Sequence, residues 1–165
     1  METPISCKFA CRRRADPALG LRIRSPPMGS PFRHRIRVRW NECDLQGVVF
    51  YANYLMYFDV AMTELWREAV QPFGDMNSSG ADMVVAEAQI AYRASARFDD
   101  ELDLVASVVK LGNTSMTTAL SVERMPEREV LAEGELRHVF VEPDTLRKRS
   151  VPDQVRTGLE RHQVG

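Results

Sequence analysis

Residues 53–69 restrict the fold of this chain more than any other segment, because they predict a long helix that is apolar around most of its circumference. Eleven apolar residues recur at helical spacings or widen that stripe onto its flanks: Tyr54, Leu55, Met56, Tyr57, Phe58, Val60, Ala61, Met62, Leu65, Trp66 and Ala69. Pro72 and Gly74 are expected to end the helix. A helix of this kind must be enclosed by other parts of the chain.

The segments around that helix predict strands. Ile36, Val38 and Trp40 alternate with arginines, which is the period-two pattern of a half-buried strand. Four further segments are rich in valine, alanine, threonine and leucine and predict long strands: 83–95, 101–111, 115–125 and 129–141. The last three are joined by short turns, so they are expected to form an antiparallel meander. A short terminal helix is predicted from Pro152 to His162.

These elements predict an α+β fold in which a curved five-stranded antiparallel sheet wraps around one long helix, since a concave sheet face covers the apolar stripe. The domain is predicted to span residues 32–152, followed by a C-terminal helix or tail at 153–165. Residues 1–31 hold five of the nine prolines and show no apolar periodicity. They predict a disordered tail or a spurious extension upstream of a start at Met28, and an arginine-rich transit peptide is a third interpretation.

Charge and cysteine usage exclude several classes of protein. Residues 1–31 carry six basic and two acidic residues, whereas the remainder carries sixteen basic and twenty-one acidic residues. A mildly acidic body gives no electrostatic reason to bind nucleic acid, and no run approaches the ~18–20 apolar residues of a membrane span. Three cysteines make no disulfide framework and no metal site, so we expect a soluble protein in the reducing cytoplasm.

One motif is more specific than these patterns. Residues 39–54 read RWNECDLQGVVFYANY, with an Asp, two residues, Gly-Val-Val, two aromatic residues, a small residue, Asn and an aromatic. This segment resembles the signature of the 4-hydroxybenzoyl-CoA thioesterase family, and residues 63–68, 96–102 and 137–141 are also similar to that family. The resemblance covers about residues 32–152. It implies the hot-dog fold and hydrolysis of an acyl-CoA thioester to a free carboxylic acid and CoA.

The motif also carries candidate catalytic residues. Asp44 lies in a polar loop just before the helix, where a carboxylate can attack a thioester carbon or activate a water. Unpaired N–H groups at the helix N-terminus suit the developing oxyanion, and Gly47 permits a tight turn of the loop. The resemblance implies that Asp44 is the catalytic carboxylate and that the backbone amide of Tyr51 polarises the carbonyl.

Substrate contacts are less marked in the sequence. Asn53, Ser115 and Lys110 are candidate substrate-binding residues, with Lys110 the charged residue nearest a neutral turn at 112–114. Some relatives in the resembled family place a basic cluster at that turn to meet the phosphates of CoA. Its absence leaves acyl carrier protein open as an alternative donor. No cofactor is expected, because the CoA thioester is itself the substrate.

Other interpretations stay open beside the thioesterase. A non-catalytic hot-dog protein that binds an acyl thioester or joins a complex is one, and a Cys43 nucleophile is another. A dehydratase needs a histidine near the helix, where the sequence has none. Because residues 137–141 are apolar in both registers, they and residues 86–90 are candidate pairing surfaces between copies. The resemblance likewise implies a homodimer or a dimer of dimers (homotetramer), with active sites built from two chains.

Overall fold

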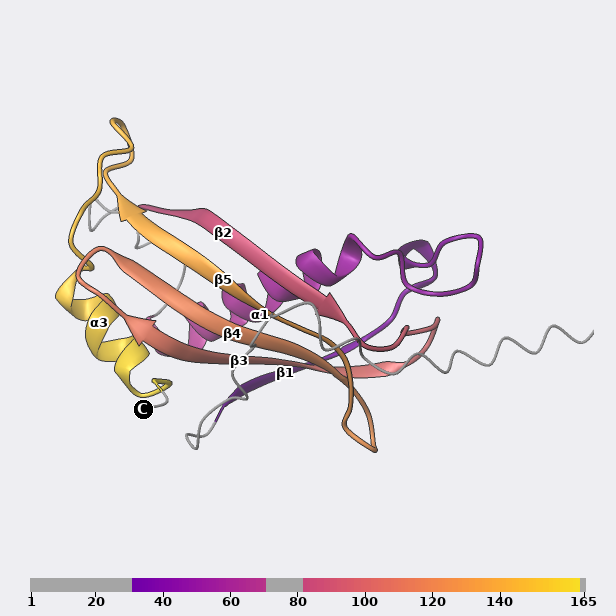
Figure 1. Ribbon diagram of the computed structural model, residues 1–165. Helices are drawn as coiled ribbons and strands as arrows, with labels where there is room; N and C mark the ends of the chain where they lie inside the picture. The colour runs from indigo at the N-terminus through magenta and orange to yellow at the C-terminus, as the bar shows by residue number, and fades with distance from the viewer. Residues whose placement is uncertain (1–30, 71–81, 164–165) are drawn as a thin grey trace, which may run out of the picture.

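The computed structural model describes residues 31–70 and 82–163 of the 165-residue chain (Figure 1). Its elements are β1 (Phe32–Arg37), the 3-10 helix η1 (Trp40–Glu42), α1 (Asn53–Ala69), β2 (Asp82–Tyr92), β3 (Glu101–Leu111), β4 (Ser115–Arg124), β5 (Glu129–Val141) and α3 (Asp153–Glu160). The expectations for residues 1–30, and for a helix stop at Pro72 and Gly74, lie outside the described residues. Within the described part, no helix is long and apolar enough to cross a membrane.

The five strands form one antiparallel sheet in the order β1-β3-β4-β5-β2. The predicted meander β3-β4-β5 is confirmed, and α1 lies against one face of the sheet (Figure 1). The sequence therefore predicted the α+β class and the hot-dog arrangement correctly. The terminal helix is also confirmed as α3, which lies at the end of the sheet away from the start of α1 (Figure 1).

The core forms between α1 and the sheet. Eight side chains of α1 are buried, at the spacings that the apolar stripe predicted: Tyr54, Tyr57, Phe58, Ala61, Met62, Leu65, Trp66 and Ala69. At one point the contact is too close for a side chain, because a Cβ on Gly134 of β5 would lie 2.1 Å from the carbonyl oxygen of Gln89 and 2.9 Å from the ring of Phe58. Gly134 thus lets β2, β5 and α1 approach one another.

Two strands end several residues before the sequence prediction. β1 ends at Arg37, and Trp40 belongs to η1, where it is 76% exposed and packs edge-on against Phe98 with ring centroids 5.3 Å apart. The alternation of residues 36–40 was misleading because the backbone turns after Val38, whose N–H donates to the carbonyl of Asp100. β2 ends at Tyr92 rather than at residue 95, since the next two N–H groups both donate to one carbonyl of β5.

The edges of the sheet also correct a prediction. Residues 137–141 are not a free pairing surface, because β5 lies inside the sheet and pairs with β2 on one side and β4 on the other. The two edges are β1 and β2. β1 is six residues long and its arginines Arg33, Arg35 and Arg37 form ion pairs with neighbouring carboxylates. β2 is eleven residues long, and its residues 84–89 are all exposed.

Candidate active site

The loop between η1 and α1 is folded back on itself. Cys43 and Val49 form an antiparallel bridge, and the N–H of Asp44 donates to the carbonyl of Val48 at 2.9 Å. The N–H of Gly47 donates to the carbonyl of Asp44 at 3.0 Å, which closes a tight turn. Gly47 has φ +72°, a conformation that costs an L residue about 1–2 kcal/mol. The predicted role of Gly47 in the turn thus has a backbone cause.

Asp44 is half-buried at the base of that turn. Its Oδ1 accepts a hydrogen bond from the N–H of Gln46 at 2.8 Å, the geometry of an Asx turn. No hydrogen bond to Oδ2 is made by the residues that the structure describes. One carboxylate oxygen therefore holds the loop, and the described residues leave the other free for a further contact.

The N-terminus of α1 follows the same loop and is not capped by a side chain. The N–H of Asn53 donates to the carbonyl of Phe50 at 2.9 Å, and that of Tyr54 donates to the carbonyl of Tyr51 at 3.3 Å. The N–H groups of Tyr51 and Ala52 make no backbone hydrogen bond within residues 31–70 and 82–163. Unpaired donors at the positive end of a helix dipole stabilise negative charge on an oxygen.

Glu42 ties this loop to α1, and residue-by-residue reasoning on the sequence missed it. Its carbonyl accepts the side-chain amide of Asn53 at 2.8 Å and the N–H of Phe50 at 3.0 Å. Its carboxylate Oε2 accepts the hydroxyl of Tyr57 at 3.0 Å and the N–H of Arg39 at 2.7 Å. The sequence holds no local signal for the Tyr57 contact, since fifteen residues separate the two partners.

Tyrosines surround the start of α1. The chain has four tyrosines, and Tyr51, Tyr54, Tyr57 and Tyr92 all lie at this end of α1, joined through ring contacts with centroids 5.5–6.5 Å apart. The hydroxyl of Tyr92 donates to the carbonyl of Tyr51 at 3.1 Å. The hydroxyl of Tyr54 accepts the N–H of Ala96 at 2.9 Å, which fastens α1 to the loop before β3.

Comparison with known proteins identifies the family. The model of the thioesterase superfamily matches residues 46–131. The chain belongs to the thioesterase superfamily. It is 27% identical to the acyl-CoA thioester hydrolase YbgC of Escherichia coli over 124 residues. The matched segment covers 75% of this chain and 92% of that protein. This membership confirms the prediction of a thioesterase.

Solved structures agree on the fold. The PA5185 protein from Pseudomonas aeruginosa superimposes with a TM-score of 0.75 at 27% identity, over 81% of this chain and 92% of that one. A 1,4-dihydroxy-2-naphthoyl-CoA thioesterase from Synechocystis superimposes with a TM-score of 0.73 over 78% of this chain and 95% of that one. At 18% identity, the second likeness concerns the fold alone.

Two of the predicted site residues, Lys110 and Ser115, lie far from the Asp44 loop. Lys110 and Ser115 flank the β3–β4 turn, which is at the opposite end of the sheet from the start of α1 (Figure 1). β3 has eleven residues, so its ends are roughly 35 Å apart at ~3.3 Å per residue. Within one chain, the structure thus brings together Asp44, Gly47, Tyr51 and Asn53 but leaves Lys110 and Ser115 remote.

The β3–β4 turn is less neutral than its own sequence suggests. Residues 147–149, an Arg-Lys-Arg run, follow β5 and fold back beside the turn. The N–H of Arg149 donates to the carbonyl of Phe140, and the N–H of Phe140 donates to the carbonyl of Thr114 in the turn. Arg156 of α3 donates to the carbonyl of Gly112 at 2.8 Å. These basic residues were missed as neighbours of the turn because they lie more than thirty positions away in the sequence.

Three other titratable side chains lie outside the contacts described above. Glu64 forms an ion pair with Arg67 on the surface of α1. His138 is buried on β5, and burial lowers its pKa below the usual value against an opposing effect of Asp59. Cys43 is a half-buried free thiol. Among the described residues, no group of three or more metal-ligating side chains is arranged to hold a metal ion.

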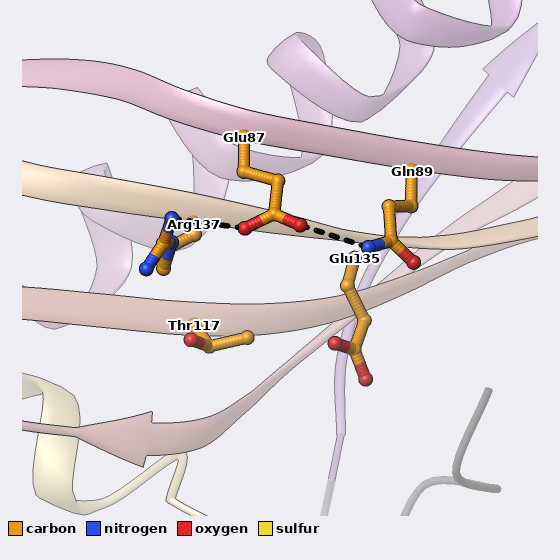
Figure 2. A pocket seen from close by; sticks show the side chains of 5 residues that line it. All are labelled: Glu87, Gln89, Thr117, Glu135 and Arg137. Atoms are coloured by element: carbon orange, nitrogen blue, oxygen red, sulfur yellow. Dashed lines mark hydrogen bonds and ion pairs between the residues drawn. The ribbon is translucent and has the colours of Figure 1, made fainter. Parts of the chain in front are cut away.

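A hollow of about 160 Å³ lies elsewhere, on the face of the sheet turned away from α1 (Figure 2). It is lined by Glu87, Gln89, Thr117, Glu135 and Arg137. Arg137 is paired with Glu87 at 2.9 Å, and Glu87 also accepts the side-chain amide of Gln89 at 2.9 Å. Two carboxylates against one paired arginine give no attraction for a phosphorylated substrate, so this hollow is not part of the candidate active site.

Proposed function

We propose that this thioesterase hydrolyses an acyl-CoA thioester to a carboxylic acid and CoA, with Asp44 as the reacting carboxylate. The observation that carries the proposal is the position of Asp44, whose Oδ2 is left unbonded by the described residues, one loop before the uncapped N-terminus of α1. Membership of the thioesterase superfamily and the likeness to an acyl-CoA thioester hydrolase support the same reaction.

The carbonyl oxygen of the thioester is proposed to lie at the unpaired N–H of Tyr51. As the tetrahedral intermediate forms, its oxygen becomes negative, and the amide and helix dipole stabilise that charge. Asp44 then acts in one of two ways. As general base it removes a proton from the attacking water, whereas as nucleophile it forms a mixed anhydride that water cleaves. In both cases the C–S bond breaks, and the thiolate of CoA leaves and takes up a proton.

We also propose that the working unit is at least a homodimer, with a site shared between chains. A long exposed edge strand without proline or lysine invites pairing with a second copy, and β2 is such a strand. Large apolar side chains are exposed on both β2 and α1, among them Val85 (57%) and Met56 (61%). The other edge strand, β1, is less suited to pairing with a second copy, because its arginines are charged.

Pairing of two β2 strands would also complete the site. An antiparallel β2–β2 pair around a twofold axis reverses the direction of the partner's strands. The partner's β3–β4 turn then comes to the end of the sheet at which Asp44 lies. Lys110, Ser115 and residues 147–149 of that chain would face the nucleotide end of CoA, whose phosphates attract basic side chains.

The free thiol of Cys43 fits the expected cytoplasmic setting.

The first test is turnover by Asp44→Asn, measured as thiol release from acyl-CoA. The amide keeps the oxygen that accepts the N–H of Gln46 but cannot act as base or nucleophile, so kcat should fall at least ~10²-fold. Cys43→Ala is the matched control in the adjacent position and should keep most of the activity. Wild-type turnover by Asp44→Asn would exclude Asp44, and loss of turnover in a folded Cys43→Ala would favour the thiol.

The second test uses a panel of short, long and aromatic acyl groups, each presented on CoA, on pantetheine and on acyl carrier protein. Contacts to the CoA phosphates predict a higher KM for the pantetheine thioesters at similar kcat. A clear preference for the carrier protein would replace CoA as the donor. Binding without release of thiol from any member of the panel would favour the non-catalytic binding protein.

A further inference from the structure

Glu42 accepts four hydrogen bonds, and two of them come from side chains of α1, the helix behind the catalytic loop. Two go to its carbonyl, from the N–H of Phe50 at 3.0 Å and the side-chain amide of Asn53 at 2.8 Å. Two go to its Oε2, from the N–H of Arg39 at 2.7 Å and the hydroxyl of Tyr57 at 3.0 Å. Both the main chain and the side chain of Glu42 are therefore fixed in place.

The contact with Tyr57 is shielded from water. Tyr57 is 3% exposed, and the Glu42 side chain is 14% exposed. Burial raises the pKa of the Tyr57 hydroxyl, and the Glu42 carboxylate raises it further. The phenol therefore keeps its proton and donates a hydrogen bond to Glu42. A hydrogen bond to a charged acceptor is stronger than one between neutral groups, and low exposure strengthens it again.

The two groups of the proposed chemistry both extend from this anchored point. Asp44 lies two residues after Glu42, and Tyr51 lies one residue after Phe50. The two arms of the loop are joined by three successive contacts. The first is the hydrogen bond between Phe50 and Glu42, the next is the Cys43–Val49 bridge, and the last is the Asp44–Val48 hydrogen bond. Any movement of the first contact relative to α1 changes the position of the Asp44 carboxylate relative to the Tyr51 amide.

The anchor on α1 comes from two successive turns. Asn53 and Tyr57 are four residues apart, so their side chains project from the same face of the helix. They hold the carbonyl and the carboxylate of Glu42 respectively. We propose that Glu42 is a positioning residue, which with Tyr57 holds the Asp44 carboxylate in register with the N–H of Tyr51. This inference rests on the proposed role of Asp44.

Such positioning acts on the rate constant of the chemical step. A displacement of about 1 Å can cost ~10² in rate when reacting groups are held by a scaffold. The hydrogen bonds of the Glu42 carboxylate go to Tyr57 and Arg39 and not to the candidate substrate-binding residues, so loss of the carboxylate contacts should change KM little. The carboxylate oxygen, rather than the negative charge, carries the geometry, and Gln at position 42 keeps an oxygen for the Tyr57 hydroxyl and the Arg39 N–H.

The experiment compares Tyr57→Phe with Tyr54→Phe. Both tyrosines are buried on α1 and both lose one hydroxyl contact, but the hydroxyl of Tyr54 bonds to Ala96 rather than to Glu42. We expect Tyr57→Phe to lower kcat at least ~10-fold with KM within about twofold. Tyr54→Phe should keep kcat within about twofold, while thermal unfolding midpoints report the stability of both. Equal kcat values for the two variants would overturn the proposal.

Two further variants test the mode of action. Glu42→Ala should lower kcat like Tyr57→Phe, and Glu42→Gln should restore most of the loss; equal losses in the two would contradict the positional role. In an Asp44→Asn background, Tyr57→Phe should leave the residual rate unchanged, because the group to be positioned is gone. A further ~10-fold loss there would show action independent of Asp44 and overturn the inference. Wild-type turnover of Asp44→Asn alone would instead contradict the proposed function.

Discussion

Gly134→Ala is a direct test of how closely β5, β2 and α1 approach one another. A Cβ at this position would lie 2.1 Å from the carbonyl oxygen of Gln89 and 2.9 Å from a ring carbon of Phe58. The first contact is with backbone, which cannot rotate away as a side chain can. To reach an ordinary contact of 3.4 Å, β2 must therefore move away from β5 by more than an ångström.

The size of the effect follows from these contacts. Forcing extra carbon into a packed site costs ~1–3 kcal/mol, and the upper part of that range applies where backbone must move. At roughly 2–4 °C per kcal/mol for a chain of this size, the unfolding midpoint should fall by about 5–10 °C. Because β2 is the edge proposed to pair with a second copy, the dimer should weaken in the same variant.

The assay is thermal unfolding followed by circular dichroism, with Gly112→Ala as the matched control. A Cβ on Gly112 would meet Ser115 atoms at 3.3 and 3.4 Å, a tight but tolerable contact at a turn. We expect its midpoint to stay within about 2 °C of the wild type, well below the shift of a core overpacking variant. A Gly134→Ala midpoint equal to that of Gly112→Ala would refute the close approach.

Two other predictions concern assembly and pH. Val85→Lys puts a charge on the exposed edge strand β2 and should shift the species seen by light scattering towards the 18.8 kDa monomer, with loss of kcat. A fully active monomer would rule out the shared site. Burial lowers the pKa of His138 in the folded state, so its contribution to stability is present above the unfolded pKa of about 6.5 and is lost as pH falls. His138→Leu should therefore gain stability relative to wild type between pH 7.5 and 5.5; a difference that does not change with pH would contradict this.

The sequence alone determined the elements and one part of the site. The apolar spacing of residues 53–69 and the alternation in the long strands depend on neighbours one to four positions away, so local patterns suffice to predict α1 and the meander. The same holds for the placement of Asp44, Gly47 and Tyr51 beside the start of α1, because a loop and the helix that follows it are contiguous in the chain. Trp40 shows the limit of such local patterns. The alternation of residues 36–40 continues past the point at which the backbone turns, and only the contact between Val38 and Asp100 reveals that turn.

The tertiary structure decided which strands meet and where the sheet ends. Alternation indicates which face a residue occupies but not which strand lies beside it, so β5 was mistaken for a pairing surface and its interior position came only from the topology. Distance along the chain likewise hid the Glu42–Tyr57 contact and the approach of Arg156 to Gly112. These contacts join segments fifteen and forty-four residues apart. They are fixed by the packing of α1 and α3 against the sheet, which no local pattern encodes.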